Sequence, residues 1–91
     1  MLLRVSAQLP APAADTVFRD MNGEAVLVNL ATNRIFSLNA TGARFWSLLV
    51  EGATQEAAEE RLLAEFEVGP EELRAEMSGL LRALRAEGLV E

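Results

Sequence analysis

The sequence predicts an α+β domain in which a three-stranded antiparallel sheet is followed by three helices. Three observations lead to this fold class. The chain has 91 residues, which is the size of one small domain. Residues 16–38 form short β-prone runs separated by turn residues, and from Asn39 onward the apolar residues recur at helical spacing. Runs of strands followed by runs of helices are typical of folds in which the helices cover one face of an antiparallel sheet.

Two turn signals divide the first half of the chain into strands. An Asn22-Gly23 pair separates TVFRDM from EAVLVNL, and it indicates a two-residue hairpin because both central residues of a type I′ turn need positive φ. The run ATN then separates the central strand from RIFSL, with Asn33 suited to the left-handed conformation. We therefore expect strands at 16–21, 24–30 and 34–38, with 24–30 in the middle.

Side-chain alternation along these strands assigns the two faces of the sheet. The set expected to cover the core comprises Val17, Val26, Val28, Leu30, Phe36 and Leu38. The opposite face then carries Phe18, Leu27 and Ile35. Residues 1–15, which contain two prolines, are expected to form an N-terminal arm or short edge strand. Leu2, Leu3 and Val5 of this arm would cover that opposite face, unless the face is left for a partner.

Capping residues mark the ends of three helices in the second half. Asn39 and Thr54 are suited to cap the first two helices, and Gly52 ends the first. Pro70 is suited to the first position of a third helix, which stops at Gly88. The apolar stripes are Phe45, Trp46, Leu49 and Val50 on the first helix, Ala58, Leu62 and Phe66 on the second, and Leu73, Met77, Leu80, Leu81 and Leu84 on the third.

The composition excludes several kinds of catalytic chemistry. The chain contains no Cys, His, Tyr or Lys, so thiolate nucleophiles, imidazole acid–base catalysis, Cys/His metal cages and Schiff bases are all excluded. Acidic clusters such as Glu56, Glu59 and Glu60 lie on a predicted helix and lack the loop pattern of a calcium site. We therefore expect no catalytic residues, no metal and no cofactor.

The net charge of −6 argues against binding to a polyanion such as DNA or an acidic membrane surface. A peptide or protein partner fits better. The sequence has no apolar run close to the roughly 20 residues of a membrane span, and its N-terminus lacks the pattern of a secretory signal. We expect the protein to act in the cytoplasm.

Basic residues on the third helix raise a DNA-binding alternative. Arg74, Arg82 and Arg85, together with Ser78, form a second stripe beside the apolar one. In a winged helix-turn-helix regulator, this stripe would belong to the recognition helix. The same helix carries more acidic than basic residues, namely Glu71, Glu72, Glu76 and Glu87. Duplex binding needs several unopposed cations, so this alternative is the less favoured one.

The third strand is the edge of the predicted sheet. Residues 34–38 pair with the central strand on one side only, and Arg34 is the only residue there of the kind that usually guards an edge. An unguarded edge can accept an extended peptide as an added strand. It can equally be covered by a loop or by a second copy of the protein, as in an edge-strand homodimer.

The segments GEAVLVNLATNRIFSLNATGARFWSLLVEGATQEAAEERLLAEFEV and ELRAEMSGLLRALRAEGLVE resemble the PqqD-like proteins, also called RiPP precursor peptide recognition elements. The resemblance covers residues 16–91, and its most specific parts are LNATGARFW, the EGAT turn and the terminal GLV. It implies a PqqD-like winged helix-turn-helix domain that makes no covalent change itself. Such a domain binds the leader region of a ribosomally synthesised precursor peptide and delivers it to a modifying enzyme.

The resemblance also implies the position of the site. In this family the leader adds as a strand against the third strand and packs in the groove beside the third helix. The implied peptide-binding residues are Arg34, Ile35, Phe36, Ser37 and Leu38 on the strand, with Leu73, Arg74, Met77, Ser78, Leu81 and Arg82 on the helix. We expect apolar niches lined by Ile35, Met77 and Leu81 to dominate affinity, with Arg74 or Arg82 pairing with a leader carboxylate.

Two positions depart from the family pattern. Asn33 stands where glycine is common, and Glu76 stands where aspartate is frequent. The strand-to-helix segment resembles the lasso-peptide group, whose members act with a leader protease and a cyclase. The alternative within the family is a peptide chaperone of a pyrroloquinoline quinone pathway or of another pathway with a radical enzyme.

Overall fold

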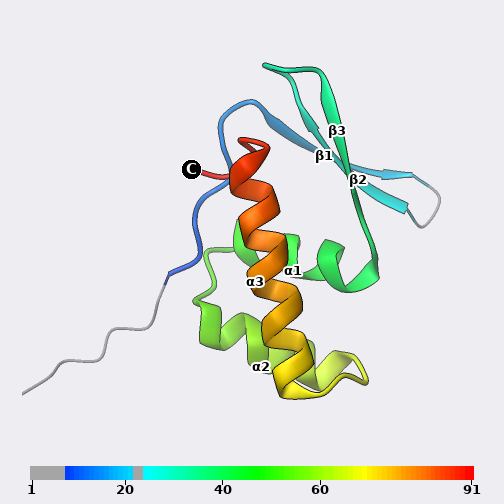
Figure 1. The fold of residues 1–91 in the computed structure, drawn as a ribbon, viewed down its shortest axis with the longest axis vertical. Coiled ribbons are helices and arrows are strands. Elements are labelled where there is room, and N and C mark those ends of the chain that lie inside the picture. The colour runs from blue at the N-terminus through cyan, green and yellow to red at the C-terminus, as the bar shows by residue number, and fades with distance from the viewer. Residues whose placement is uncertain (1–7, 22–23) are drawn as a thin grey trace, which may run out of the picture.

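The computed structural model describes residues 8–21 and 24–91. Its strands are β1 (Thr16–Met21), β2 (Glu24–Asn29) and β3 (Arg34–Leu38), and its helices are α1 (Ala40–Val50), α2 (Gln55–Glu65) and α3 (Pro70–Ala86). Figure 1 shows the sheet at one end of the molecule, α1 and α2 toward the other, and α3 running along the long axis past all of them. The predicted order of three strands followed by three helices is confirmed, and the arrangement is winged-helix-like.

The three strands form one antiparallel sheet in the order β1-β2-β3. The first hairpin pairs Met21 with Glu24, so β1 and β2 flank the expected two-residue turn, although Asn22 and Gly23 themselves lie outside the described residues. The second hairpin pairs Asn29 with Arg34. Asn33 has φ of 60° in the loop between these two residues, which confirms its predicted left-handed conformation. β2 lies in the middle, so β1 and β3 are both edges.

The predicted assignment of the sheet faces is wrong for β1 and β2. Leu27 lies opposite Phe18 and Phe36, and it is fully buried against the helices. Val28 lies opposite Val17 and Ile35, so this row occupies the outer face. Val26 is two residues from Val28 and therefore lies on the same outer face, because side chains alternate along a strand.

The physical reason for the error is the length of the second turn. β2 ends at Asn29 rather than at Leu30, and residues 30–33 form a four-residue loop. A shift of one residue in register moves every side chain to the other face. Leu30 consequently lies in the loop and is exposed, while Phe36 and Leu38 keep their predicted places on the core side.

Asn29 is the only buried polar residue in the described part of the chain, with 5% of its surface exposed. Its side-chain amide donates a hydrogen bond to the backbone carbonyl of Glu87 over 2.8 Å, and its Oδ1 accepts one from the amide of Ala31 over 3.0 Å. Both polar atoms of the side chain are therefore satisfied. These bonds attach the end of β2 to the C-terminal end of α3.

The predicted helix caps are confirmed. Asn39 Oδ1 accepts a hydrogen bond from the amide of Gly42 over 2.7 Å, and Thr54 Oγ1 accepts one from the amide of Ala57 over 3.1 Å. Pro70 is the first residue of α3. Gly52 and Gly88 follow α1 and α3 with φ of 84° and 68°, a left-handed conformation that glycine adopts without steric cost.

The core lies between the inner face of the sheet and the three helices. Its largest fully buried side chains are Leu27, Phe45, Leu49, Leu62, Leu73, Leu84 and Leu89. On the surface, Arg44 of α1 donates hydrogen bonds to both carboxylate oxygens of Glu65 on α2, over 2.8 and 3.1 Å. This hydrogen bonding lowers the pKa of the Glu65 carboxyl. The pair connects the two helices on their exposed side.

The first described residues are attached to the end of the chain. Ala13 donates a backbone hydrogen bond to Leu89 over 3.0 Å, and Glu91 donates one to Ala11 over 2.8 Å. Figure 1 shows this blue segment beside the red C-terminus. Leu9 is buried in the core. The expected cover of one sheet face by Leu2, Leu3 and Val5 concerns residues 1–7, which lie outside the described residues.

We predict that Asn29→Ala lowers the free energy of unfolding by about 1–3 kcal/mol, because the substitution leaves the buried carbonyl of Glu87 and the amide of Ala31 without their partner. Urea denaturation monitored by circular dichroism would measure the change. Ser78→Ala at an exposed position of α3 is the control, and we expect it to change stability by less than about 0.5 kcal/mol. Equal stability of the two variants would contradict a role for Asn29 in holding β2 to α3.

Candidate functional site

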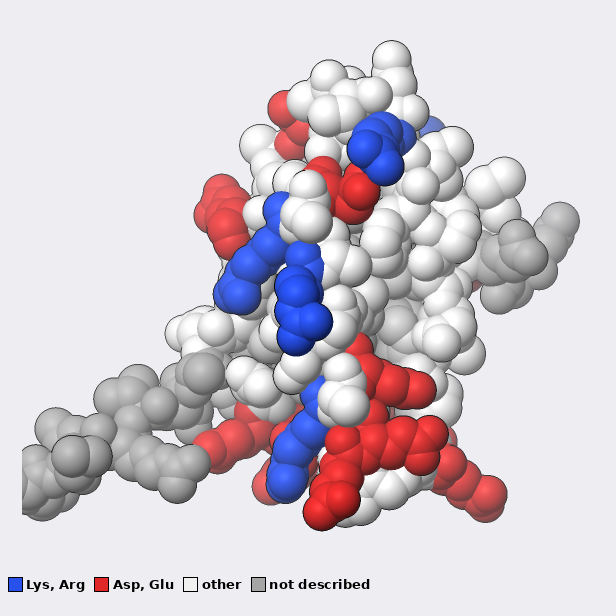
Figure 2. Space-filling view, in the orientation of Figure 1, with Lys and Arg blue, Asp and Glu red and all other residues white. Residues whose placement is uncertain are grey.

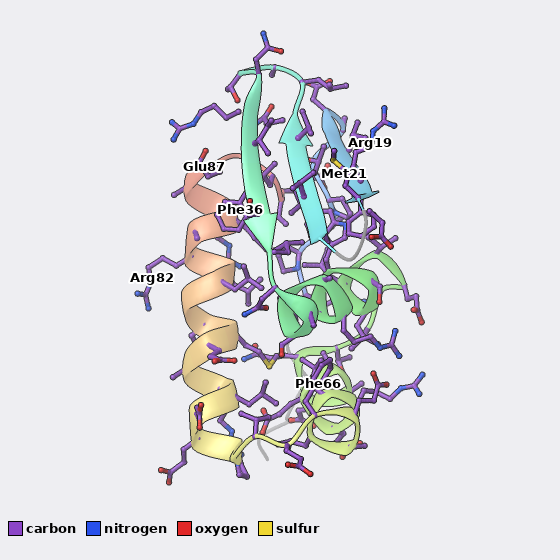
Figure 3. The ribbon with its side chains drawn as sticks, turned by 90° about the vertical axis from the view of Figure 1, so that its right-hand side faces the viewer. Arg19, Met21, Phe36, Phe66, Arg82 and Glu87 are labelled. Carbon is purple, nitrogen blue, oxygen red and sulfur yellow. The ribbon has the colours of Figure 1, made fainter. Side chains whose placement is uncertain are left out.

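The free edge of β3 runs beside α3. β3 pairs with β2 on one side, and no strand of the described chain pairs with its other side. Figure 3 shows α3 along this free side, with the Phe36 side chain between β3 and the helix. β3 passes into α1 through Asn39 alone, so the capping bond to Gly42 holds the end of the strand. The free edge therefore belongs to a short strand, β3, whose end is attached directly to α1.

A cavity of about 320 Å³ opens between this strand, the start of α1 and the middle of α3. Its walls are residues 36–38 of β3, Asn39, Thr41 and Gly42 at the start of α1, and Ala75, Glu76, Gly79 and Leu80 of α3, with Phe45, Leu62, Leu73 and Met77 also lining it. We call this cavity, together with the adjoining edge of β3, the groove. Phe45, Leu62, Leu73 and Met77 are buried core residues, so they form an apolar floor.

The cavity lining of the groove contains few ionisable side chains. Glu76 is the only ionisable side chain among its lining residues. The other polar side chains of the lining belong to Ser37, Asn39 and Thr41. Within residues 8–21 and 24–91, no cluster of acidic side chains has the geometry to hold a metal ion. The arrangement is suited to holding an apolar side chain next to free backbone groups.

The structure brings together five of the eleven residues that the sequence implied for peptide binding. Phe36, Ser37, Leu38, Leu73 and Met77 line the cavity. Leu81 is buried in the core, and Ser78 is exposed on α3 outside the cavity lining.

The three arginines among the implied residues also lie outside the cavity lining. Arg74 Nε forms an ion pair with Glu59 of α2 over 2.9 Å, and Arg34 Nε forms one with Glu87 over 3.1 Å. Arg82 extends from α3 on the side away from the strands (Figure 3). Arg34 is the first residue of β3, so its backbone is part of the free edge of that strand.

Ile35 occupies a different surface from the one the sequence implied. It lies opposite Val28 on the outer face of the sheet and is 69% exposed. Phe36 and Leu38 are turned to the inner face, because side chains alternate along a strand. Ile35 therefore borders the free edge from the side opposite to the cavity.

Sequence reasoning missed the α3 residues that face the strand. Glu76, Gly79 and Leu80 are spaced three and four residues apart, so they share one helix face. This face lies beside the apolar stripe, on the opposite side from the arginines. The available sequence signal was Gly79 itself, because a glycine in the middle of a helix lowers helix stability. In the structure, an added Cβ at this position would meet no atom within 4 Å. A glycine in mid-helix with open space beside it marks a surface that no part of the described chain fills.

Charge is unevenly distributed around the groove. Figure 2 shows mostly uncharged surface between the arginines of α3 and the strands, and acidic side chains gathered toward the α2 end of the molecule. Arg74 is already paired with Glu59 at that end. The groove therefore lies on a largely neutral strip.

Comparisons with known proteins identify a family and two similar structures. The family model described as Coenzyme PQQ synthesis protein D (PqqD) matches residues 24–90. A solved structure described as TbiB1 in complex with the TbiA(beta) leader peptide is 33% identical, with a TM-score of 0.81 over 89% of this chain and 94% of that one. No curated protein matches this sequence.

A second solved structure shares the fold at lower identity. It is described as lasso peptide synthetase B1 complexed with the leader peptide, and it is 19% identical with a TM-score of 0.80. The superposition covers 88% of this chain and 94% of that one. At this identity the likeness supports the fold alone.

We predict different effects of alanine at the two helical glycines that line the cavity. Gly79→Ala should raise the free energy of unfolding by about 0.5–1 kcal/mol, since alanine has the higher helix propensity and the new Cβ meets nothing within 4 Å. Gly42→Ala should give a smaller gain or a loss, since its Cβ would lie 3.1 Å from Asn39 Oδ1. Urea denaturation of both variants checks this. A stabilising Gly42→Ala of the same size as Gly79→Ala would contradict close packing at the cap.

Proposed function

The chain belongs to the PqqD family, and on that premise we propose that it binds the leader region of a ribosomally synthesised precursor peptide and presents it to modifying enzymes. The leader adds to the sheet as a fourth strand beside β3. Its inward side chains enter the cavity between β3 and α3. The protein itself makes no covalent change to the peptide.

The observation that carries this proposal is the free edge of β3 next to an apolar cavity. Strand addition uses main-chain hydrogen bonds for affinity and pockets for alternate side chains for specificity. The cavity volume of about 320 Å³ lies at the low end of small-molecule pockets, which suits peptide side chains rather than a large cofactor. The edge and the cavity together supply both parts of such recognition.

In this proposal, apolar contacts in the cavity contribute more to leader affinity than ion pairs with the arginines do. Phe36 and Leu38 of β3 face Gly79 and Leu80 of α3 across the cavity, so a leader side chain there is enclosed by apolar groups. Arg74 and Arg34 are already engaged in surface ion pairs, and such pairs contribute at most about 1 kcal/mol. In this proposal the arginines adjust affinity for a leader carboxylate but do not determine binding.

A role in DNA binding is not supported by the charges on α3. α3 carries three acidic residues beside its three arginines, and the chain carries a net charge of −6. Duplex binding depends on cations that displace counterions. The neutral strip beside β3 fits a peptide better (Figure 2).

Within the family, we favour a lasso-peptide pathway over a pyrroloquinoline quinone pathway. The support is the 33% identity to TbiB1, solved in complex with a leader peptide, together with the fold shared with a lasso peptide synthetase B1, which was also solved with a leader peptide. In this proposal the partners are the precursor leader and a leader protease or other modifying enzyme, and they meet in the cytoplasm. Self-association through β3 would compete with leader binding for the same edge.

We predict that a fluorescein-labelled leader peptide binds this protein saturably, measured by fluorescence anisotropy. The probes are the leader of the precursor encoded beside this protein's gene and the TbiA(beta) leader. A scrambled peptide of the same composition should not bind. Failure of both leaders to bind would overturn the proposal. Analytical ultracentrifugation without peptide would then show whether β3 pairs with a second copy.

The variant Gly79→Leu should weaken leader binding at least tenfold while the protein stays folded. Position 79 lines the cavity and has open space beside it, so leucine fills the cavity without displacing the core. Ser78→Leu is the matched control, since it adds the same side chain at an exposed neighbouring position outside the cavity lining. If both variants bound the leader as the wild type does, the cavity would not be the binding site.

We expect Arg82→Ala to change the Kd of the leader by less than about fivefold, which corresponds to a surface ion pair of at most about 1 kcal/mol. Anisotropy titrations at low and at physiological salt would measure it. A loss larger than that of Gly79→Leu would show that charge pairing, and not the cavity, governs recognition.

A further inference from the structure

The outer face of the sheet carries an apolar row that ends at the free edge of β3. Val17 lies opposite Val28, and Val28 lies opposite Ile35, so one side chain from each strand contributes to the row. The partly buried side chains packed against the core are Phe36, Ala43, Ala53, Leu63, Phe66, Val68 and Leu80, and none of them belongs to this row. The row is thus separate from the core in the described structure.

Ile35 is the most exposed member of the row. Val17 and Val28 are half-buried, whereas Ile35 is 69% exposed, the largest exposed fraction among the large apolar side chains described. Val28 has row neighbours on both sides, while Ile35 has one only because β3 is an edge. The row ends at β3, which is the strand beside which the proposed leader adds.

Strand pairing determines where the side chains of an added strand point. Directly opposite residues of neighbouring strands lie on the same face, whichever direction the added strand takes. A leader residue opposite Phe36 or Leu38 therefore faces the cavity, and a leader residue opposite Ile35 faces outward. That outward residue lies next to Ile35 and continues the row.

We infer that Ile35 selects a β-branched or aromatic leader residue on the outer face, so that the leader is read from both sides of its strand. This inference rests on the proposed function and adds a second specificity contact to it. Cross-strand pairs of apolar side chains stabilise a sheet, and β-branched and aromatic partners do so most strongly. Ser37 shares the outer face with Ile35 and is exposed, so the leader residue opposite Ser37 has no apolar partner.

Disulfide trapping tests the register, because the chain contains no cysteine of its own. The variants Ile35→Cys and Ser37→Cys would each be mixed with a set of leader peptides that carry one cysteine at successive positions. Opposed residues in a sheet lie within the Cα separation that a disulfide spans. We expect each variant to trap mainly one leader position, and the two positions to lie two residues apart. Val17→Cys on the far edge is the control and should trap none.

The affinity of Ile35 variants for the leader tests whether Ile35 selects the residue opposite it. Ile35→Thr keeps a β-branched side chain but removes apolar surface, and we expect it to weaken leader binding about three- to tenfold by anisotropy. Val17→Thr makes the same kind of change in the same row away from the β3 edge, and it should alter the Kd less than about twofold. Replacing the trapped leader residue by serine should remove most of the difference between wild type and Ile35→Thr.

Three results would overturn the inference while leaving the proposed function intact. They are a Kd for Ile35→Thr within about twofold of the wild-type value, equal losses for Ile35→Thr and Val17→Thr, and trapping of the same leader positions by the Ile35→Cys and Val17→Cys variants. In those cases the outer row serves another contact, such as a second copy of the protein. Failure of the wild-type protein to bind any leader would instead overturn the proposed function itself.

Discussion

The direct passage from β3 into α1 is the constraint on which the rest of the site depends. Asn39 is the only residue between the two elements, and its side chain accepts the hydrogen bond from Gly42 that begins the helix. A longer loop would let the strand move relative to the core. Instead, the edge of β3 is attached to a helix whose Phe45 is fully buried, so the strand is held in place before any peptide arrives. Such preorganisation lowers the entropic cost of binding.

The opposite wall of the groove is held at its C-terminal end. Asn29 bonds to the carbonyl of Glu87, and the carboxylate of Glu87 pairs with Arg34 at the start of β3. Both contacts connect the sheet to the last turn of α3. Between this end and the core residues Leu73 and Met77, α3 faces β3 with Gly79 and Leu80 and leaves the cavity open. The two walls are attached at their ends, and Gly79 leaves open space between them.

The elements of this fold were largely predictable, because their boundaries depend on local chemistry. Asn33, Asn39, Thr54, Pro70 and Gly88 each act within a few residues of their own position. The faces of β1 and β2 were not predictable, because they depend on whether the second turn has three residues or four. Both alternating sets in β2 contain apolar side chains, so the pattern does not show which set is inside. Asn29 also obscured the pattern, since a polar side chain is buried there for a hydrogen bond to Glu87, 58 residues away. The same kind of distant packing explains why Glu76 and Gly79 escaped prediction as groove residues.

The attachment of residues 11–13 to residues 89–91 has a consequence for how the protein is made. Leu89 and Val90 are buried, and their partners lie near the start of the chain. The sheet and the first two helices can form from nearby segments while the chain is still being synthesised. The core cannot close until residue 90 has left the ribosome, because contacts between distant parts of a chain form only after both parts are available. A nascent chain stalled within α3 would therefore expose the apolar floor of the groove, and such a chain would be a substrate for chaperones rather than a receptor for peptides.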